Sequence, residues 1–195
     1  MINTAEMFRM FLPYRGDAIV IPGRGGRHWV ETTDNEKLDA TLGDPAMGGH
    51  SGFGLGIALA QPNRKVYLFD SDGDIHMSMG MLATIAEQAP KNLYHFVLDN
   101  EIYATTGGQP VPNAKVVDYA AIAMAAGYPR AFSFTELEDL EKALPEIIEG
   151  GGPVFVHMKV YPEVQNEAIG TRKPWNPRAR TKVITDVRGA LTGQG

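Results

Sequence analysis

Apolar and polar positions alternate along the chain in two different patterns. Short runs of β-branched and aromatic residues predict strands, and longer stretches with apolar residues at helical spacing predict helices. The expected strands are Ala18–Ile21, Val66–Phe69, Tyr94–Leu98, Arg130–Phe134 and Pro153–Val160. The expected helices are Thr4–Leu12, Gly48–Ala60, Ile75–Gln88, Val117–Ala126 and a last one that ends near Glu149. Thr135 and Glu138 have the spacing of a capping box at the start of this last helix.

Residues 22–46 are mostly loop in this reading, with one short strand expected at His28–Val30. The regular alternation of strands and helices elsewhere predicts an α/β fold. We expect a doubly wound, mostly parallel sheet with helices on both faces. Ligands of such sheets bind at the carboxyl ends of the strands, so the loops after the strands are the places to search for chemistry.

The chain has 195 residues, which fits one domain with a substantial core. We expect the domain over residues 1–161 and an extended basic arm over residues 162–195. This arm carries six basic and three acidic side chains, although the whole chain has a net charge of −5. The arm has two interpretations: a solvated surface strap, or a contact with a partner subunit or an anionic substrate.

Composition excludes several classes of function. The chain contains no Cys, which removes disulfides, zinc–thiolate sites and iron–sulfur clusters. Neither the Gly-x-Gly-x-x-Gly dinucleotide fingerprint nor the Gly-Lys-Ser/Thr phosphate loop occurs. The net negative charge argues against nucleic acid as a partner. Because no long apolar run or leader opens the chain, we expect no membrane partner and a cytoplasmic location.

Two polar segments follow neighbouring predicted strands. Ser71-Asp72-Gly73-Asp74 follows the strand at Val66–Phe69, and Asp99-Asn100-Glu101-Ile102-Tyr103 follows the strand at Tyr94–Leu98. A β-α-β unit brings the ends of two parallel strands together, so Asp72 and Asn100 should face one point in space. Carboxylate and amide oxygens are ligands that Mg²⁺ accepts, often together with a diphosphate.

This spacing resembles the metal- and diphosphate-binding motif of thiamine diphosphate (ThDP) enzymes, written Gly-Asp-Gly followed after some 25 to 30 residues by Asn. Ser71 replaces the first Gly of that motif. The resemblance implies that Asp72, the side chain of Asn100 and the carbonyl of Ile102 bind Mg²⁺. It also implies that the backbone N–H groups of Gly73 and Asp74 meet the diphosphate, as helix N-termini do.

The resemblance extends to segments on either side of this motif. Asp44 to Gly52 is similar to the segment that lies under the cofactor in this family, so Met47 would wedge between the two rings of ThDP. The carbonyl of Pro45 would accept a hydrogen bond from the aminopyrimidine. Tyr103 and the following Thr-Thr-Gly-Gly-Gln stretch are similar to a loop that closes over the diphosphate. His50 and His76 lie beside these segments, and either one could meet substrate or diphosphate or be structural.

ThDP enzymes also need a Glu that activates the aminopyrimidine ring, and in this family a separate pyrimidine-binding domain supplies it. The chain matches the diphosphate-binding half over about residues 40–160, so we assign no catalytic residue on it and expect a pyrimidine-binding partner subunit in a hetero-oligomer. Its motifs are most similar to the beta subunits of sulfopyruvate decarboxylases and to their phosphonopyruvate relatives. The implied activity is decarboxylation of a small anionic 2-oxo acid. A ThDP-dependent carboligase subunit, similar to acetolactate synthase, and a non-catalytic scaffold subunit are the alternatives.

Overall fold

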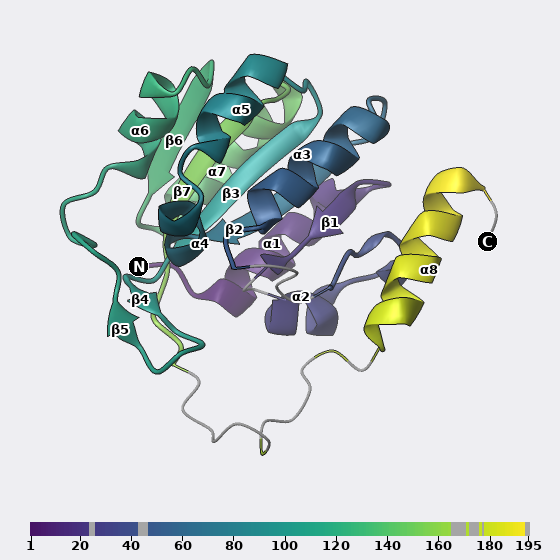
Figure 1. Cartoon of the computed structure of the whole chain (residues 1–195), viewed down its shortest axis with the longest axis horizontal. Helices are drawn as coiled ribbons and strands as arrows, with labels where there is room; N and C mark the ends of the chain where they lie inside the picture. The colour runs from purple at the N-terminus through teal and green to yellow at the C-terminus, as the bar shows by residue number, and fades with distance from the viewer. Residues whose placement is uncertain (24–25, 43–46, 165–170, 172–175, 177, 194–195) are drawn as a thin grey trace.

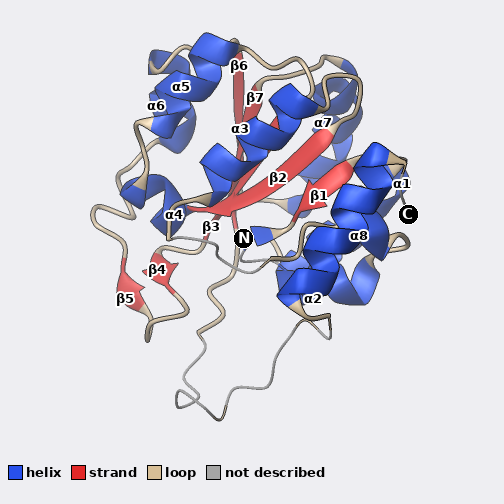
Figure 2. Cartoon of the chain, turned by 45° about the vertical axis from the view of Figure 1, so that its right-hand side comes forward, coloured by secondary structure: helices blue, strands red, loops and turns tan. Residues whose placement is uncertain are grey.

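A parallel five-stranded sheet forms the centre of the computed structural model, which describes residues 1–23, 26–42, 47–164, 171, 176 and 178–193. The strands follow the order β1-β2-β3-β7-β6, and all neighbouring pairs are parallel (Figures 1 and 2). Their bounds are β1 Ile19–Ile21, β2 Val66–Ser71, β3 Leu93–Asp99, β7 Val154–Lys159 and β6 Arg130–Phe134. The predicted doubly wound α/β fold is therefore confirmed.

Helices cover both faces of this sheet. One face carries α1 (Thr4–Arg15), α2 (Gly26–Thr32) and α7 (Leu137–Glu149). The other face carries α3 (His50–Ala60), α4 (Asp72–Met77), α5 (Met81–Gln88), α6 (Tyr119–Ala125) and α8 (Arg180–Thr192). A 3-10 helix at Glu36–Leu38 and a small hairpin of β4 (Ile102–Tyr103) and β5 (Gln109–Pro110) complete the described elements.

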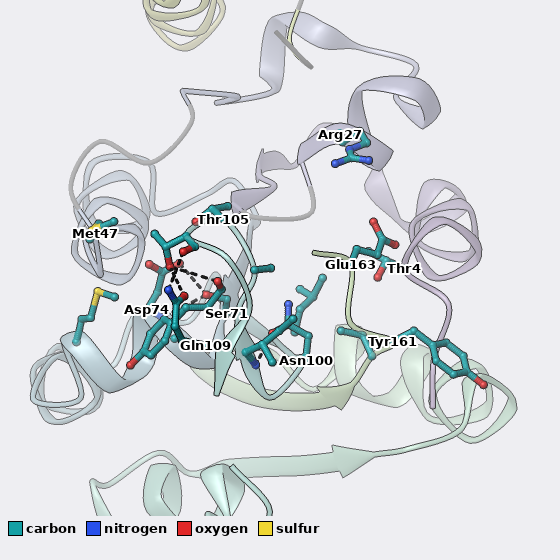
Figure 3. A pocket seen from close by; sticks show the side chains of 18 of the residues that line it. Thr4, Arg27, Met47, Ser71, Asp74, Asn100, Thr105, Gln109, Tyr161 and Glu163 are labelled. Carbon is teal, nitrogen blue, oxygen red and sulfur yellow. Dashed lines mark hydrogen bonds between the residues drawn. The ribbon is translucent and has the colours of Figure 1, made fainter. Parts of the chain in front are cut away.

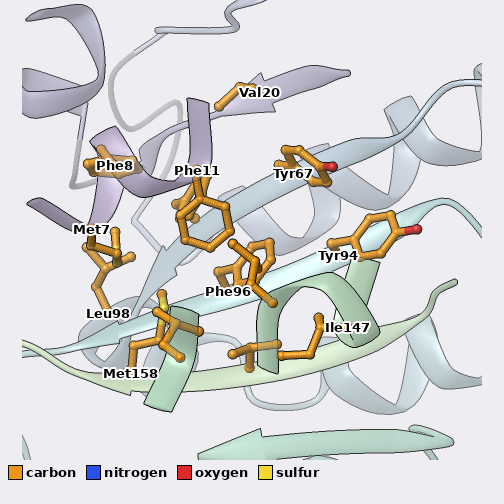
Figure 4. Close-up of a cluster of buried hydrophobic side chains, with 14 of the residues drawn as sticks. Met7, Phe8, Phe11, Val20, Tyr67, Tyr94, Phe96, Leu98, Ile147 and Met158 are labelled. Carbon is orange, nitrogen blue, oxygen red and sulfur yellow. The ribbon is translucent and has the colours of Figure 1, made fainter. Parts of the chain in front are cut away.

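Aromatic side chains dominate the core between the sheet and the α1–α7 face (Figure 4). Phe69 on β2 and Phe96 on β3 are register partners, and their rings stack with centroids 5.1 Å apart. Phe11 from α1 contacts both rings edge-on, at 5.1 and 4.7 Å. Such buried rings contribute large apolar areas, so this cluster holds β2 and β3 in a fixed relative position below the loops that follow them.

Three local predictions are wrong. The segment His28–Val30 is not a strand but the middle of helix α2, in which Trp29 is fully buried against the aromatic core. The predicted helix Ile75–Gln88 is two helices, because the backbone leaves the helical conformation at Ser78 (φ −136°, ψ 35°) and a turn precedes α5. Helix α7 has Glu136 as its N-cap residue, with no side-chain capping bond, in place of the predicted box at Thr135.

The described part of the C-terminal segment adds a helix to the fold. Val183 and Val187 of α8 are buried in the same core cluster as α3 and α5. Before the helix, Arg178 and Asn176 hydrogen-bond the backbone and side chain of the segment Asp39–Thr41. The helix therefore lies beside the strand β1 edge (Figure 2). Every described helix is too short or too polar to cross a membrane.

Candidate functional site

The register of β2 and β3 places the two polar segments side by side. Ser71, the last residue of β2, pairs with Leu98 of β3. Asp72, which follows β2, and Asp99, the last residue of β3, therefore lie at the same edge of the sheet. Neighbouring strands lie about 4.8 Å apart. The predicted meeting of the two loops at the carboxyl edge of the sheet thus follows from the observed pairing.

Asp72 is a buried carboxylate whose surroundings compensate its charge only weakly. Its exposed fraction is 0%, and its carboxylate oxygens make no hydrogen bond of full geometry with the described residues, although the backbone N–H groups of Gly73 and Glu101 lie close enough to lower its pKa slightly. Burial, followed by the negative charge of Asp99, raises the pKa of Asp72 to about 8. Because a weakly compensated buried charge costs free energy, the site favours either a proton or a cation at this carboxylate.

Asp99 lies beside Asp72 in a very different environment. His157 Nε2 and Lys159 Nζ lie 2.9 and 2.8 Å from its Oδ2 atom, and the backbone N–H of Glu101 donates to Oδ1. Burial alone would raise the pKa of Asp99, but the hydrogen bonds of His157 and Lys159 and the charge of Lys159 outweigh it and lower the pKa. Asp99 is thus ionised and its negative charge acts on Asp72.

The loop after β3 turns sharply at Asn100. The Asn100 side-chain oxygen accepts a hydrogen bond from the backbone N–H of Ile102 at 3.0 Å. Between them, Glu101 has a positive φ of 65°. The Ile102 carbonyl accepts the N–H of Ala104 at 3.0 Å, which leaves it a second lone pair. Both predicted ligands on this loop, Asn100 and Ile102, line a common cavity.

This cavity has a volume of about 440 Å³, within the range of small-molecule and cofactor sites. Figure 3 shows Met47, Ser71, Asp74, Thr105 and Gln109 on one side and Thr4, Arg27, Tyr161 and Glu163 on the other, with Asn100 between them. Of the predicted site residues, Met47, Gly73, Asp74, Asn100, Ile102 and Tyr103 line the cavity. Asp72 does not line it, although its chain neighbours Ser71 and Gly73 do.

Ser71, the departure from the family motif, caps helix α4. Its hydroxyl accepts the backbone N–H of Asp74 at 3.2 Å and donates to the Asp74 carboxylate at 2.9 Å. The N–H of Asp74, expected to meet a diphosphate, therefore already has a partner within the chain. The Asp74 carboxylate also accepts the backbone N–H of Gly48 at 3.0 Å, which ties α4 to the segment that carries Met47.

Gly73 and Tyr103 are in close contact across the site. A Cβ atom added at Gly73 would lie 2.9 Å from the Tyr103 ring, so only glycine allows this approach. Met47 projects from its loop with 59% of its surface exposed, and it lines the cavity as expected. Pro45, predicted to contact the aminopyrimidine, lies outside the described residues.

The histidines have structural surroundings. His50, at the start of α3, is buried with its Nδ1 atom 3.4 Å from the Asp74 carboxylate. His76 faces the ring of Tyr119. Neither residue lines the cavity, so the structure favours the structural reading of both. His95 and His157 are buried within β3 and β7, as their strand positions indicate.

The far side of the cavity contains residues that the sequence did not point to. Thr4 lies at the start of α1, Arg27 lies in α2, and Tyr161 and Glu163 follow β7. His28 Nε2 lies 2.9 Å from Glu163, across 135 positions of sequence. No local motif marks these residues, because only the sheet brings the start of α1 and the end of β7 together through the Ile2–Val160 bridge.

Comparison with known proteins agrees with this arrangement. Residues 26–158 match the family model described as thiamine pyrophosphate enzyme, C-terminal TPP binding domain. The chain belongs to this family. The match begins at the start of α2 and ends within β7, so it includes the loops that follow β2 and β3, and it confirms the family that the motif spacing indicated.

Relatives of this TPP-binding domain include a subunit of similar length and proteins that are much longer than this chain. The chain is 43% identical over 164 residues to the sulfopyruvate decarboxylase subunit beta of Methanothermobacter thermautotrophicus, covering 83% of this chain and 84% of that protein. It is 37% identical over 160 residues to the phosphonopyruvate decarboxylase of Streptomyces viridochromogenes, covering 81% of this chain. It spans only 39% of that protein, and 37% of a second phosphonopyruvate decarboxylase from Streptomyces hygroscopicus.

Solved structures show the same fold. The thiamine diphosphate-dependent 4-hydroxybenzoylformate decarboxylase of Rhodococcus jostii superposes with a TM-score of 0.66 at 16% identity. The superposition covers 85% of this chain and 33% of that one. The doubly wound domain described here therefore corresponds in architecture to one part of a larger enzyme chain.

Proposed function

We propose that this chain is the diphosphate- and Mg²⁺-binding subunit of a split ThDP-dependent 2-oxo acid decarboxylase. The substrate would be a 3-substituted pyruvate such as sulfopyruvate or phosphonopyruvate. A pyrimidine-binding partner subunit would complete the active site. The observation that carries the proposal is the buried, weakly compensated carboxylate of Asp72 between two residues that line the Asn100 cavity.

The residues present fit a divalent cation. Asp72 offers two buried oxygens that have only weak hydrogen-bond contacts, and Asn100 and Ile102 offer oxygens at the cavity. A hard cation such as Mg²⁺ takes this kind of oxygen set and commonly completes it with phosphate oxygens and water. A cation would also remove the electrostatic cost that the neighbouring Asp99 imposes on Asp72.

Other residues of the cavity would position the cofactor. Gly73 leaves backbone accessible where a side chain would collide with Tyr103. Met47 would support the two rings, since its flexible thioether adapts to irregular surfaces. Thr106 and Gln109 hydrogen-bond each other at 3.0 Å and so hold the loop that faces these groups.

Bound thiamine diphosphate would supply the electron sink for the electron pair of the broken carbon–carbon bond. The partner subunit would supply the Glu that activates it. On this chain, Leu98, Ile102, Ala104 and Val160 give the cavity an apolar lining that limits water at the reacting carbon. This chain thus binds and orients, and we expect it to be inactive without its partner.

Carboligation is the second candidate. The chain is 30% identical over 147 residues to the acetolactate synthase isozyme 1 large subunit of Escherichia coli, of which it spans 25%. The two reactions differ in whether a proton or a second carbonyl compound takes up the electron pair.

The test is an assay of the chain together with its partner, ThDP and Mg²⁺. We expect release of CO₂ and a free aldehyde from 3-sulfopyruvate or 3-phosphonopyruvate. The variant Asp72→Ala should lose cofactor binding and activity, and Asp139→Ala, which changes an exposed carboxylate on α7, should keep both. A condensed product without free aldehyde would favour the ligase, and the absence of any ThDP-dependent reaction would favour a scaffold.

A further inference from the structure

Arg27 is in an unusual position in the cavity. It lies in the first turn of α2, on the side opposite Ser71 and Asp74 (Figure 3). Among the described residues that line the cavity, it is the single arginine or lysine. The residues proposed above for Mg²⁺ and the diphosphate belong to the segments that follow β2 and β3, so Arg27 is not one of them.

The Arg27 guanidinium is available for a ligand. It makes no ion pair or hydrogen bond with any part of the chain that the structure describes, in contrast to Arg15 and Arg178, which have several each. The acidic residue on the same side, Glu163, is within 3.0 Å of His28 Nε2 through both carboxylate oxygens. The Glu163–His28 pair therefore gives this carboxylate a partner other than Arg27.

We infer that Arg27 binds the anionic substituent at carbon 3 of the substrate, a phosphonate or a sulfonate. This inference rests on the proposed function and adds a specificity-determining residue to it. The planar guanidinium offers a fork of N–H donors that matches two oxygens of a tetrahedral anion. A 3-substituted pyruvate carries two anionic groups, and the cavity has one described guanidinium to bind one of them.

The chemistry decides which group Arg27 holds. The carboxylate leaves as neutral CO₂, so a strong ion pair to it would stabilise the ground state more than the transition state and slow the reaction. The substituent at carbon 3 keeps its charge throughout. An ion pair with this group is therefore retained from substrate to product, and it contributes to selection without opposing the loss of CO₂.

The direct test measures binding of unreactive analogues by calorimetry. The complex of this chain with its partner, ThDP and Mg²⁺ is titrated with 3-phosphonopropionate, 3-sulfopropionate and propionate. We expect Arg27→Gln to weaken binding of one or both charged analogues at least about tenfold, as for the loss of a charge-assisted pair. Propionate binding should change less than about twofold. The two charged analogues show which anion the site prefers.

Two further variants complete the test. Arg27→Lys keeps the charge but loses the fork, so an intermediate affinity is expected. Arg9→Gln removes an exposed cation of α1 outside the cavity and should bind like the unchanged protein. Equal affinities of the unchanged protein and Arg27→Gln for both charged analogues would overturn the inference, and so would an equal loss for propionate.

Kinetics separate this inference from the proposed function. If the proposed function holds, Arg27→Gln should lower kcat/KM for the charged substrate about tenfold or more, mainly through KM, and leave pyruvate turnover nearly unchanged. A complex that releases no CO₂ from any 2-oxo acid would refute the proposed decarboxylase. The analogue titration still decides the role of Arg27 in that case, because it requires no turnover.

Discussion

Asp72 and Asp99 are neighbouring buried carboxylates whose pKa values shift in opposite directions. His157 and Lys159 hold Asp99 in its charged form, whereas the backbone N–H groups of Gly73 and Glu101 favour the charged form of Asp72 too weakly to offset its burial. The β2–β3 register places these two residues at adjacent strand ends. The fold therefore holds one negative charge in place and leaves the adjacent carboxylate ready for a cation, at a cost to the stability of the metal-free protein.

The variant Asp72→Asn should stabilise the metal-free protein. An amide at this position carries no charge and can donate to the Asp99 carboxylate, so the repulsion disappears. We expect a gain of about 1 kcal/mol or more, which corresponds to a rise in Tm of roughly 2–4 °C for a chain of this size. Thermal unfolding of both proteins at pH 8 without Mg²⁺ measures this difference in Tm. A Tm at or below that of the unchanged protein would contradict the assigned charge of Asp72.

The same variant should lose stabilisation by the cofactor. Ligand at about 100 times its Kd stabilises a folded protein by about 2.7 kcal/mol, so ThDP with Mg²⁺ should raise the Tm of the unchanged protein clearly. Asp72→Asn should show no such rise, and Asp139→Asn should show the full rise. An undiminished shift in Asp72→Asn would remove Asp72 from the metal site.

The stability of the metal-free protein should depend on pH through Asp72. Its pKa is raised from 3.8 to about 8, so between these values the folded protein keeps a proton that the unfolded chain has released. Stability from this group is therefore full below about pH 4 and decreases as pH rises toward 8. The Tm difference between Asp72→Asn and the unchanged protein should grow from pH 5 to pH 8. A constant difference over that range would contradict the raised pKa.

Replacing Gly73 should disturb the site through Tyr103. A Cβ atom at Gly73 would lie 2.9 Å from the Tyr103 ring, so Gly73→Ala should displace that ring and cost about 1–3 kcal/mol. We also expect at least tenfold weaker ThDP binding by titration. The matched control is Gly56→Ala on α3. An added Cβ atom there would meet no other part of the chain within 4 Å, so the variant should gain about 0.5–1 kcal/mol of stability. Equal behaviour of the two variants would show that the contact is unimportant.

The C-terminal helix offers a test of the proposed division between a domain over residues 1–161 and an arm over residues 162–195. Val183 is fully buried, and the next residue, Ile184, is 49% exposed. Val183→Asp should therefore destabilise the protein by about 2 kcal/mol or more, and Ile184→Asp should change stability by less than about 0.5 kcal/mol. Chemical denaturation of both variants gives the denaturant midpoints that are compared. Similar midpoints would show that the helix contributes little to the domain and would support a separate arm.

The sequence by itself determined the class of fold and the meeting of the two polar segments that contain Asp72 and Asn100. Strand and helix periodicities are local properties, and the 28 residues from Asp72 to Asn100 include one helix-length stretch between two strands. A β-α-β unit of that length has few possible arrangements. The sequence therefore sufficed to predict that these two loops meet, and the family match agrees with the motif.

Other features needed the tertiary structure. The segment around Trp29 has the local pattern of a strand but forms a helix, because the aromatic core on the α1 side buries that ring. Helix α4 ends early because the backbone leaves the helical conformation at Ser78, which the apolar pattern through Gln88 does not reveal. The opposite side of the cavity unites Thr4, Arg27 and Glu163, which are far apart in the chain. Only the parallel sheet, by pairing strands regardless of their separation in sequence, decides such contacts.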